Sequence, residues 1–427
     1  MLSPPPLFKN TKEFLIVATL LILIIVGRLF FIYKDYQHLK SLPNYYYTDA
    51  QVIKLYKGKG KKEGSTLLRL HSIDNLDFYL YTNKEPPNRF DWVRVKLKLK
   101  KDTTFFDYLR GFFANGEIVE HIEDGFDAKA YLRELISRQH NGYESIKTFY
   151  YAIFLADPLD RELREKISNL GVSHLVALSG FHLGILWMII FAMAYIPYRY
   201  FQQRYYPYRN RNIDLGLFVL IFLAIFVLFV GAPPALIRSY VMLLIAWIIL
   251  MFGLELISFK FLTIAILIIL AIKPKYVASL GLLLSMAGVF YIFLTIKWFK
   301  RKPAWFITLI AIPVGIFLLM FPIGHYFFPQ TTIWQLSSPI LSILFIIFYP
   351  LVAILHFFSL GSLFDSSLLW LFNLPQKSID IYMPTPLIIV YIILSIGAIF
   401  SKRVFFATLA LALLITTWYM YKYLTLI

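Results

Sequence analysis

The sequence predicts a mainly α-helical membrane bundle of about ten helices, with a small all-β domain of the OB type inserted after the first helix. Hydrophobic residues make up 59% of the 427 residues and the mean hydropathy is +0.66, well above the roughly 45 to 50% apolar content of soluble domains. One polar region, after the first apolar run, changes to the two-residue alternation of β-strands. We therefore expect a multi-pass membrane protein with one sizeable domain outside the lipid.

Apolar runs near the length needed to cross a hydrocarbon core of about 30 Å recur along the chain. Several are shorter than the roughly 20 residues of a full span, so we expect some to be tilted, broken or re-entrant. The runs lie at 14–33, 175–197, 213–230, 235–252, 258–272, 280–297, 305–322, 338–356, 385–400 and 404–422.

The charges beside these runs predict their orientation. Lysines precede the first run and no small-residue cleavage site follows it, which favours an uncleaved anchor, residues 1–40, with its amino end inside. Residues 34 to about 170 then lie outside, and the arginine-rich loop 199–211 lies inside, as the positive-inside rule requires. The same count leaves Lys402 and Arg403 outside unless an earlier run is re-entrant.

Residues 45–124 carry the β-strand pattern. Short alternating segments separated by turn-rich pieces are typical of a small barrel of the OB type, in which one sheet face and the loop after the first strand commonly bind single strands. Any small barrel or sandwich shares this pattern. The predicted strands are 50–56, 65–72, 77–82, 91–101 and 117–123.

The fourth predicted strand alternates four apolar residues with four cations. One face packs on a core while the other shows a basic track whose spacing, roughly 6.6 Å, is similar to that of phosphates along an extended strand. Tyrosines and a tryptophan nearby are candidate stacking rings for single-stranded DNA. The alternative is a solvated edge strand that lysines protect from aggregation. The candidate DNA-binding residues are Lys59, Lys61, Lys62, Tyr79, Tyr81, Trp92, Arg94, Lys96, Lys98 and Lys100.

Residues 125–170 predict amphipathic helices that form a linker on the membrane surface or against the bundle. The following segment, HLVALSGFHLGIL, interrupts an apolar run with Ser179, Gly180 and His182. An ionisable group inside a span is a functional candidate, and on a continuous helix Ser179 and His182 share a face. Alternatively, Gly180 permits local unwinding, or Gly180 and Gly184 simply allow close helix packing.

Two further interruptions complete a set that predicts a lined polar cavity. GAPPALIRSYVM places a double proline before Arg238, which alternatively snorkels to the interface. SLGLLLSMAGVF forms a small-residue face with Ser279, Gly281, Ser285 and Gly288.

These stretches resemble the ComEC family of inner-membrane DNA-uptake proteins. GVSHLVALSGFHLGIL is similar to the signature of that family's competence domain, and the other two stretches are similar to its second and third characteristic motifs, in the same order. Three positions depart from the family pattern: Leu283 stands where a glutamine is usual, Ala235 where a serine is frequent and Ser239 where an alanine is frequent.

The resemblance implies a short form, because the histidines include no H-x-H pair for the metallo-β-lactamase-like domain that many members carry. It implies a competence-type transmembrane domain at 171–427 of a multi-pass protein in the bacterial cytoplasmic membrane. The implied activity is a channel, not an enzyme, that moves single-stranded DNA inward during natural transformation. Its partners would be single-stranded DNA, membrane lipid, a periplasmic DNA receptor and a cytosolic motor or single-strand-binding proteins, with no cofactor or metal.

Two other classes of function stay open from the residues. A membrane-embedded serine hydrolase or acyltransferase would use Ser179 as nucleophile and His182 as base, with a third group to orient the histidine. A non-catalytic envelope protein with an OB-like scaffold is the other. The absence of cysteine leaves no disulfide or catalytic thiol.

Overall fold

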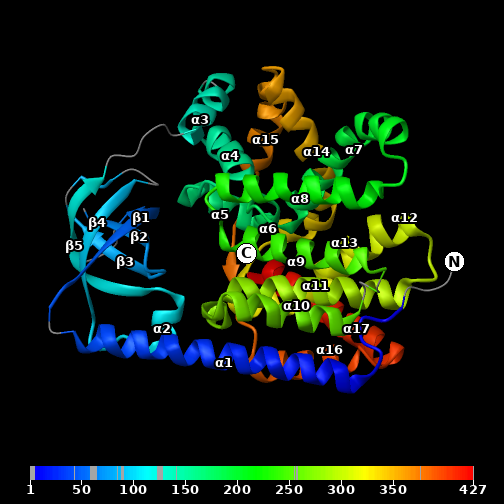
Figure 1. Ribbon diagram of the computed structural model, residues 1–427, viewed down its shortest axis with the longest axis horizontal. Coiled ribbons are helices and arrows are strands. Elements are labelled where there is room, and N and C mark those ends of the chain that lie inside the picture. Colours follow the sequence, from blue (N-terminus) through cyan, green and yellow to red (C-terminus); the bar gives the residue numbers. More distant parts are fainter. Residues whose placement is uncertain are drawn as a thin grey trace. The chain divides into compact units, whose positions relative to one another are not determined.

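The computed structural model describes residues 5–42, 44–57, 65–83, 85–87, 91–122, 128–140, 142–253, 255, 258–375 and 377–426 (Figure 1). The chain divides into two compact units. One comprises Phe8–Ala128 and Ile264–Leu280, and the other comprises Met1–Leu7, Lys129–Thr263 and Gly281–Ile427. Each unit is described by itself.

The first unit holds the long helix α1 (Thr11–Ser41) and a closed five-stranded barrel. Each strand pairs with two neighbours in the order β1-β2-β3-β5-β4, and β4 returns to β1. The small barrel expected from the sequence is confirmed, and so are all five strands. They are β1 (Tyr46–Lys57), β2 (Thr66–Ser72), β3 (Asp77–Thr82), β4 (Trp92–Leu99) and β5 (Phe112–Ile122).

Alternation places every second side chain of the strands, mostly apolar, inside the barrel. Val93, Val95 and Leu97 on β4 are fully buried, as are Leu68 and Phe78 on β2 and β3. Because β4 pairs with both β1 and β5, it is not an edge strand, and closure removes the edge that lysines would protect. The edge-strand alternative is therefore wrong. A short helix, α2 (Phe105–Arg110), joins β4 to β5 and was not predicted.

The second unit is mainly helical, with one small two-stranded sheet of β6 (Gln330–Thr331) and β7 (Ile379–Asp380). All ten apolar runs of the sequence are helical, either wholly or in large part. The helices are α7 (Gly180–Tyr205), α8 (Arg211–Phe229), α9 (Pro234–Met251), α10 (Phe259–Ile272, shared between the units), α11 (Leu280–Phe299), α12 (Ala304–Phe306), η3 (Ile307–Ala311), α13 (Ile312–Phe327), α14 (Ser338–Phe357), α16 (Thr385–Gly397) and α17 (Lys402–Leu426).

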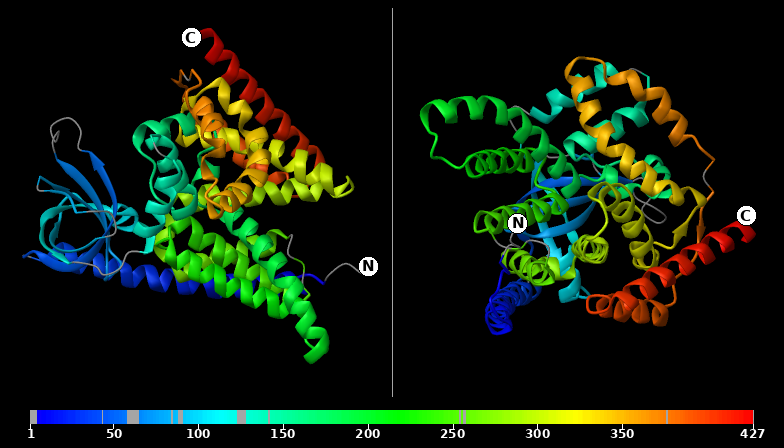
Figure 2. Two further views of the ribbon diagram at one scale, coloured as in Figure 1. Left: turned by 90° about the horizontal axis from the view of Figure 1, so that it is seen from above. Right: turned by 90° about the vertical axis from the view of Figure 1, so that its right-hand side faces the viewer.

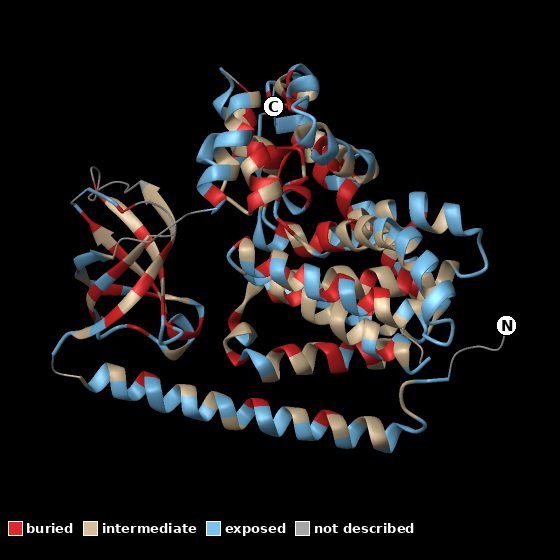
Figure 3. Cartoon of the chain, turned by 45° about the horizontal axis from the view of Figure 1, so that its top comes forward, coloured by how far each residue is buried: buried red, intermediate tan, exposed pale blue. Residues whose placement is uncertain are grey.

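Eight helical segments in the described part of the chain are long and apolar enough to cross a membrane. The apolar helices α10 and α16 are shorter, as the lengths of their runs led us to expect. Most of α1 is exposed, and α17 packs against α13 and α16 within the bundle (Figures 2 and 3). Exposed apolar helix faces of this kind are what lipid contact requires.

Amphipathic helices follow the barrel along the chain, as predicted. They are α3 (Ala128–Gln139), α4 (Glu144–Leu155) and α5 (Arg161–Asn169), and the one-turn helix α6 (Ser173–Val176) comes after them. Their apolar faces form one core with α14 and with α15 (Asp365–Phe372), in which Ile146, Ile153 and Val352 are fully buried. This segment therefore packs against helices far along the chain.

Candidate functional site

The first motif is a break between two helices. Helix α6 ends at Val176, residues 177–179 are extended or irregular, and α7 begins at Gly180. Ser179 is the N-cap of α7, with an extended backbone, and its N–H donates to Nδ1 of His182 at 3.2 Å. This is the half of a capping box in which the side chain at the third helical position satisfies the N-cap N–H. The motif therefore starts a helix, and the predicted unwinding falls just before Gly180.

The surroundings of His182 suit this capping role better than catalysis. The ring is fully buried and meets Phe345 and Tyr349 of α14 edge-on, with centroids 5.5 and 4.7 Å away. Ser179 Oγ lies 3.4 Å from Nδ1, which already accepts the backbone N–H. Among the described residues Nε2 has no hydrogen-bond partner, so the third group that would orient a catalytic histidine is not in contact with it.

Gly180 also lets the first two motifs touch. A Cβ at Gly180 would lie 2.9 Å from Ser239 Oγ on α9, closer than real Cβ atoms come, and 3.1 Å from Ser239 Cβ, which is a tight contact. A Cβ at Gly184 would meet no atom within 4 Å. Close helix packing thus explains Gly180 and not Gly184.

The second motif is a tight turn followed by a proline-initiated helix. Gly231 has φ +85°, and the Ala232 N–H reaches back to the Val227 carbonyl at 2.8 Å, which ends α8 as a glycine C-cap does. Pro233 and Pro234 then begin α9, where a proline fits the first turn. Arg238 in the next turn is only 5% exposed, so its side chain lies inside the helical unit.

The third motif lies at the start of α11. Gly281 and Ser285 are one helical turn apart, and Gly288 follows on the next turn. A Cβ at Gly288 would meet nothing within 4 Å. Among the described residues, no neighbouring helix comes close enough to Gly288 to require a glycine there.

On the barrel, two of the four cations of the basic track on β4 form ion pairs with neighbouring strands. Arg94 donates to both carboxylate oxygens of Asp49, at 2.8 and 3.2 Å, and this lowers the pKa of the Asp49 carboxyl. Lys96 pairs with Glu117, whose hydrogen bond raises the pKa of that lysine. Lys98 and Lys100 lie at the other end of the track. The four cations thus do not form one uniformly positive face.

The end with Lys98 and Lys100 adjoins three rings on β3 and β5. Tyr79 stacks on Phe113 with centroids 5.1 Å apart, and Tyr81 stacks on the same ring at 6.4 Å. Arg69 lies over Tyr79 at 5.9 Å, and Lys100 Nζ lies 5.6 Å from the Phe113 centroid. We call these five residues the aromatic row. Planar rings between cations are the arrangement that sequence-tolerant single-strand binding uses.

Phe113 and Arg69 were missed by sequence reasoning. The signal was the stretch FF at the start of β5, which was predicted to begin five residues later. The predicted ring Trp92 pairs with Ile122, at the opposite end of β5 from Phe113, and so lies away from Tyr79 and Tyr81. Lys59, Lys61 and Lys62 fall outside the described residues.

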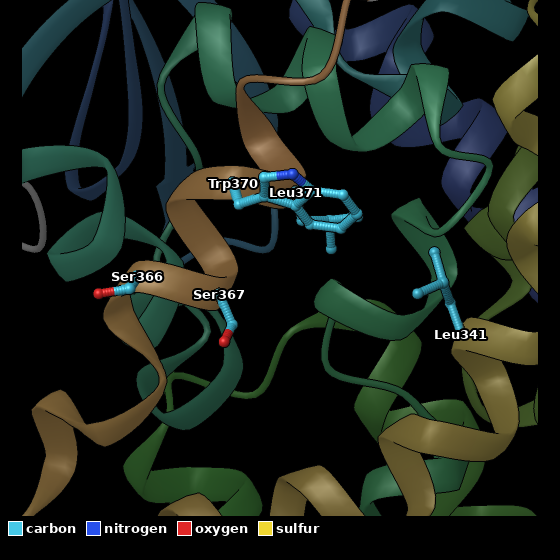
Figure 4. A pocket seen from close by; sticks show the side chains of 5 residues that line it. All are labelled: Leu341, Ser366, Ser367, Trp370 and Leu371. Carbon is cyan, nitrogen blue, oxygen red and sulfur yellow. The ribbon is translucent and has the colours of Figure 1, made fainter.

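A pocket between α14 and α15 offers no comparable chemistry. Trp370 and Leu371 lie near its middle, with Ser367 on one side and Leu341 on the other (Figure 4). Ser366 completes a lining that carries no charged group.

The fold and these sites define a class: a multi-pass membrane protein with a small barrel whose surface carries rings and cations, and with helix breaks inside the bundle. Residues 156–422 match the model of the family described as Competence protein, and the chain belongs to this family, within which that region is the ComEC competence domain. It is a family of membrane channels and not a known enzyme family. No curated protein and no solved structure matched the chain.

Proposed function

We propose that this protein translocates single-stranded DNA across the bacterial cytoplasmic membrane during natural transformation. The aromatic row carries the proposal, because it adds a surface suited to single strands to a chain of the competence family. The barrel holds the incoming strand outside, and the bundle provides the passage. A polyanion needs such a passage, since even one charge at the bilayer centre costs several kcal/mol.

The motif residues have different parts in this proposal. Ser179, Gly180 and His182 set where α7 begins, and Arg238 supplies a cation inside the bundle. Gly281 and Ser285 give α11 a face without bulky side chains. A DNA receptor outside and a motor or single-strand-binding protein inside complete the route, and another protein degrades the second strand.

The test separates entry into the periplasm from entry into the cytoplasm. In a deletion strain we expect labelled DNA to become nuclease-resistant in the periplasm and not to reach the cytoplasm, with entry into the cytoplasm restored by the wild-type gene. Loss of entry into the periplasm, or normal arrival in the cytoplasm, would contradict the proposal.

A matched pair of variants tests the barrel surface. Phe113→Ala removes the central ring of the aromatic row, whereas Tyr47→Ala removes an exposed ring opposite Lys96, outside the row. Loss of a stacked ring costs about 1 to 3 kcal/mol per base. We therefore expect Phe113→Ala to weaken single-strand binding by the purified full-length protein roughly tenfold, and Tyr47→Ala to leave it unchanged. Equal losses of single-strand binding in the two variants would mean that the aromatic row is not the DNA-binding surface.

A further inference from the structure

Three ionisable side chains from distant segments meet in the core of the helical unit. His140 follows α3, His356 lies in the last turn of α14, and Asp365 begins α15. Nδ1 of His140 lies 2.9 Å from both carboxyl oxygens of Asp365, and its Nε2 lies 2.9 Å from Nε2 of His356. Nδ1 of His356 lies 2.7 Å from the carbonyl oxygen of Val352. The groups form one chain of contacts.

The chain of contacts fixes the number of protons. A carbonyl only accepts, so Nδ1 of His356 carries a proton. If His356 is neutral, its Nε2 accepts and Nε2 of His140 donates; Nδ1 of a neutral His140 then requires a proton on the Asp365 carboxyl. The alternative places a second proton on one imidazole beside an ionised Asp365. Either way the three contacts hold three protons, whereas a carboxylate and two neutral imidazoles bring only two.

A metal ion between the two histidines fits less well. Two nitrogens bound to one tetrahedral zinc at about 2.0 to 2.1 Å lie about 3.3 Å apart, and the observed 2.9 Å is the length of an N–H···N hydrogen bond. Across the described residues, no group of three or more histidine, cysteine or acidic side chains has a geometry suited to a metal.

The surroundings bury two of the three side chains. His140 and Asp365 are 1% and 6% exposed, His356 is partly exposed, and the Tyr150 ring stacks on His140 with centroids 4.5 Å apart. Tyr150, on α4, is the titratable group that faces the cluster; on α3, Lys129 reaches the Leu155 carbonyl and Arg133 pairs with Asp157. With one extra proton the cluster is neutral, and the cost of burying an unpaired charge is avoided.

A second set of hydrogen bonds, which involves no titrating group, joins the end of α14 to the end of α3. Gln139 donates to the His356 carbonyl at 3.1 Å and accepts the N–H of Gly361 at 2.9 Å. A Cβ at Gly361 would lie 2.8 Å from His356 Nε2, so only glycine leaves room for the ring.

We propose that His140, His356 and Asp365 form a binding site for one proton, which ties the end of α14 and the start of α15 to the α3–α4 segment. Release of the proton leaves either the two Nε2 lone pairs of His140 and His356 facing each other, or the Nδ1 lone pair of His140 facing the Asp365 carboxylate. Either pair repels, so the contact between these segments weakens. The site goes beyond DNA transport and does not depend on it.

The test follows thermal unfolding of the purified full-length protein in detergent from pH 5 to pH 9. The native site holds a proton that the unfolded chain releases near pH 6.5, so wild-type stability should fall as the pH rises, with a slope of one proton per chain until the native site also releases it. His356→Gln keeps an N–H donor and does not titrate, so its slope should be flatter by that proton. Asp365→Asn removes the balancing charge and should move the release down by about one pH unit or more.

His38→Gln is the matched control, because His38 is exposed at the end of α1 and its replacement should leave the profile unchanged. The same pH profile in wild type and His356→Gln would overturn the proposal, as would one equivalent of bound zinc that is absent from His140→Gln. If the variants do not fold, ¹⁵N-histidine NMR of the wild type at pH 6 decides. The proposal requires one proton in each of the three contacts made by the ring nitrogens of His140 and His356, and a contact without a proton would also overturn it. No outcome involves DNA uptake, so the two proposals fail independently.

Discussion

At the residue scale, the serine and histidine of the first motif act on backbone geometry. Nδ1 of His182 accepts the Ser179 N–H, and this contact defines where α7 begins. A nucleophile would need the same nitrogen as its base. The spacing of three residues indicated that Ser179 and His182 could come into contact. It could not show that the Ser179 N–H is the group in contact with the ring, because this depends on the helix beginning at Gly180.

Substitutions in this motif separate the two roles. Ser179→Ala removes one hydroxyl, which costs about 1 kcal/mol as a hydrogen-bonding group, whereas loss of a nucleophile would cost several orders of magnitude in rate. His182→Ala should be worse, since it also empties a fully buried site. Gly180→Leu should be worst, because its Cβ already overlaps Ser239. Transformation frequency at matched membrane abundance should follow that order; Ser179→Ala as damaging as Gly180→Leu would favour catalysis.

Gly184 offers the control for the steric argument. Gly180→Ala should destabilise the purified protein by about 1 to 3 kcal/mol, as overpacking does, and Gly184→Ala should change thermal stability little, since its Cβ meets open space. Adding Ser239→Gly to Gly180→Ala should restore stability. Equal effects of the two single changes would mean that α9 is not the obstacle.

At the scale of elements, β4 shows what alternation predicts and what it leaves out. The pattern of Val93, Val95 and Leu97 correctly gave the buried face of the strand. The opposite face depends on neighbours that pair across the barrel, and Asp49, Glu117 and Phe113 come from strands whose register the pattern does not contain. For this reason the strand was predictable, while the cross-strand partners of Arg94, Lys96 and Lys100 were not.

Two double variants test which cations of the β4 track contact DNA. Lys98→Ser with Lys100→Ser removes the cations beside the aromatic row, and should flatten the log-log salt dependence of single-strand binding by about 0.7 for each phosphate that no longer meets a cation. Arg94→Ser with Lys96→Ser removes cations toward the end of β4 away from Phe113, and should change the slope less. Titrations of the full-length protein at two or more salt concentrations measure both. A larger effect of the Arg94 and Lys96 pair would contradict this prediction and would mean that DNA binds along the whole length of β4.

At the scale of the whole molecule, the contacts of α14 bear on the number of membrane crossings. Ser338 Oγ at its start donates to the Gly171 carbonyl at 3.0 Å, and His356 at its end contacts His140 at 2.9 Å. Both ends of a helix about 30 Å long therefore touch the segment between residues 139 and 171. The sequence places seven apolar runs between residues 138 and 362, and if all seven crossed, these two positions would face opposite sides of the membrane.

The contact requires an even number of crossings, so we expect one of those runs not to cross. The two candidates are α10, which is shorter than a full span, and α14, whose two ends meet the same segment. The same change moves Lys402 and Arg403 to the inside, as the positive-inside rule prefers. Because the chain has no cysteine, single cysteines can be labelled in spheroplasts with an impermeant maleimide. Arg138→Cys and Ser362→Cys, both at exposed positions, should label from one side, with Asp102→Cys and Arg204→Cys as references for the outside and the inside. Labelling of positions 138 and 362 from opposite sides would restore the count of seven crossings and contradict the contact at His140.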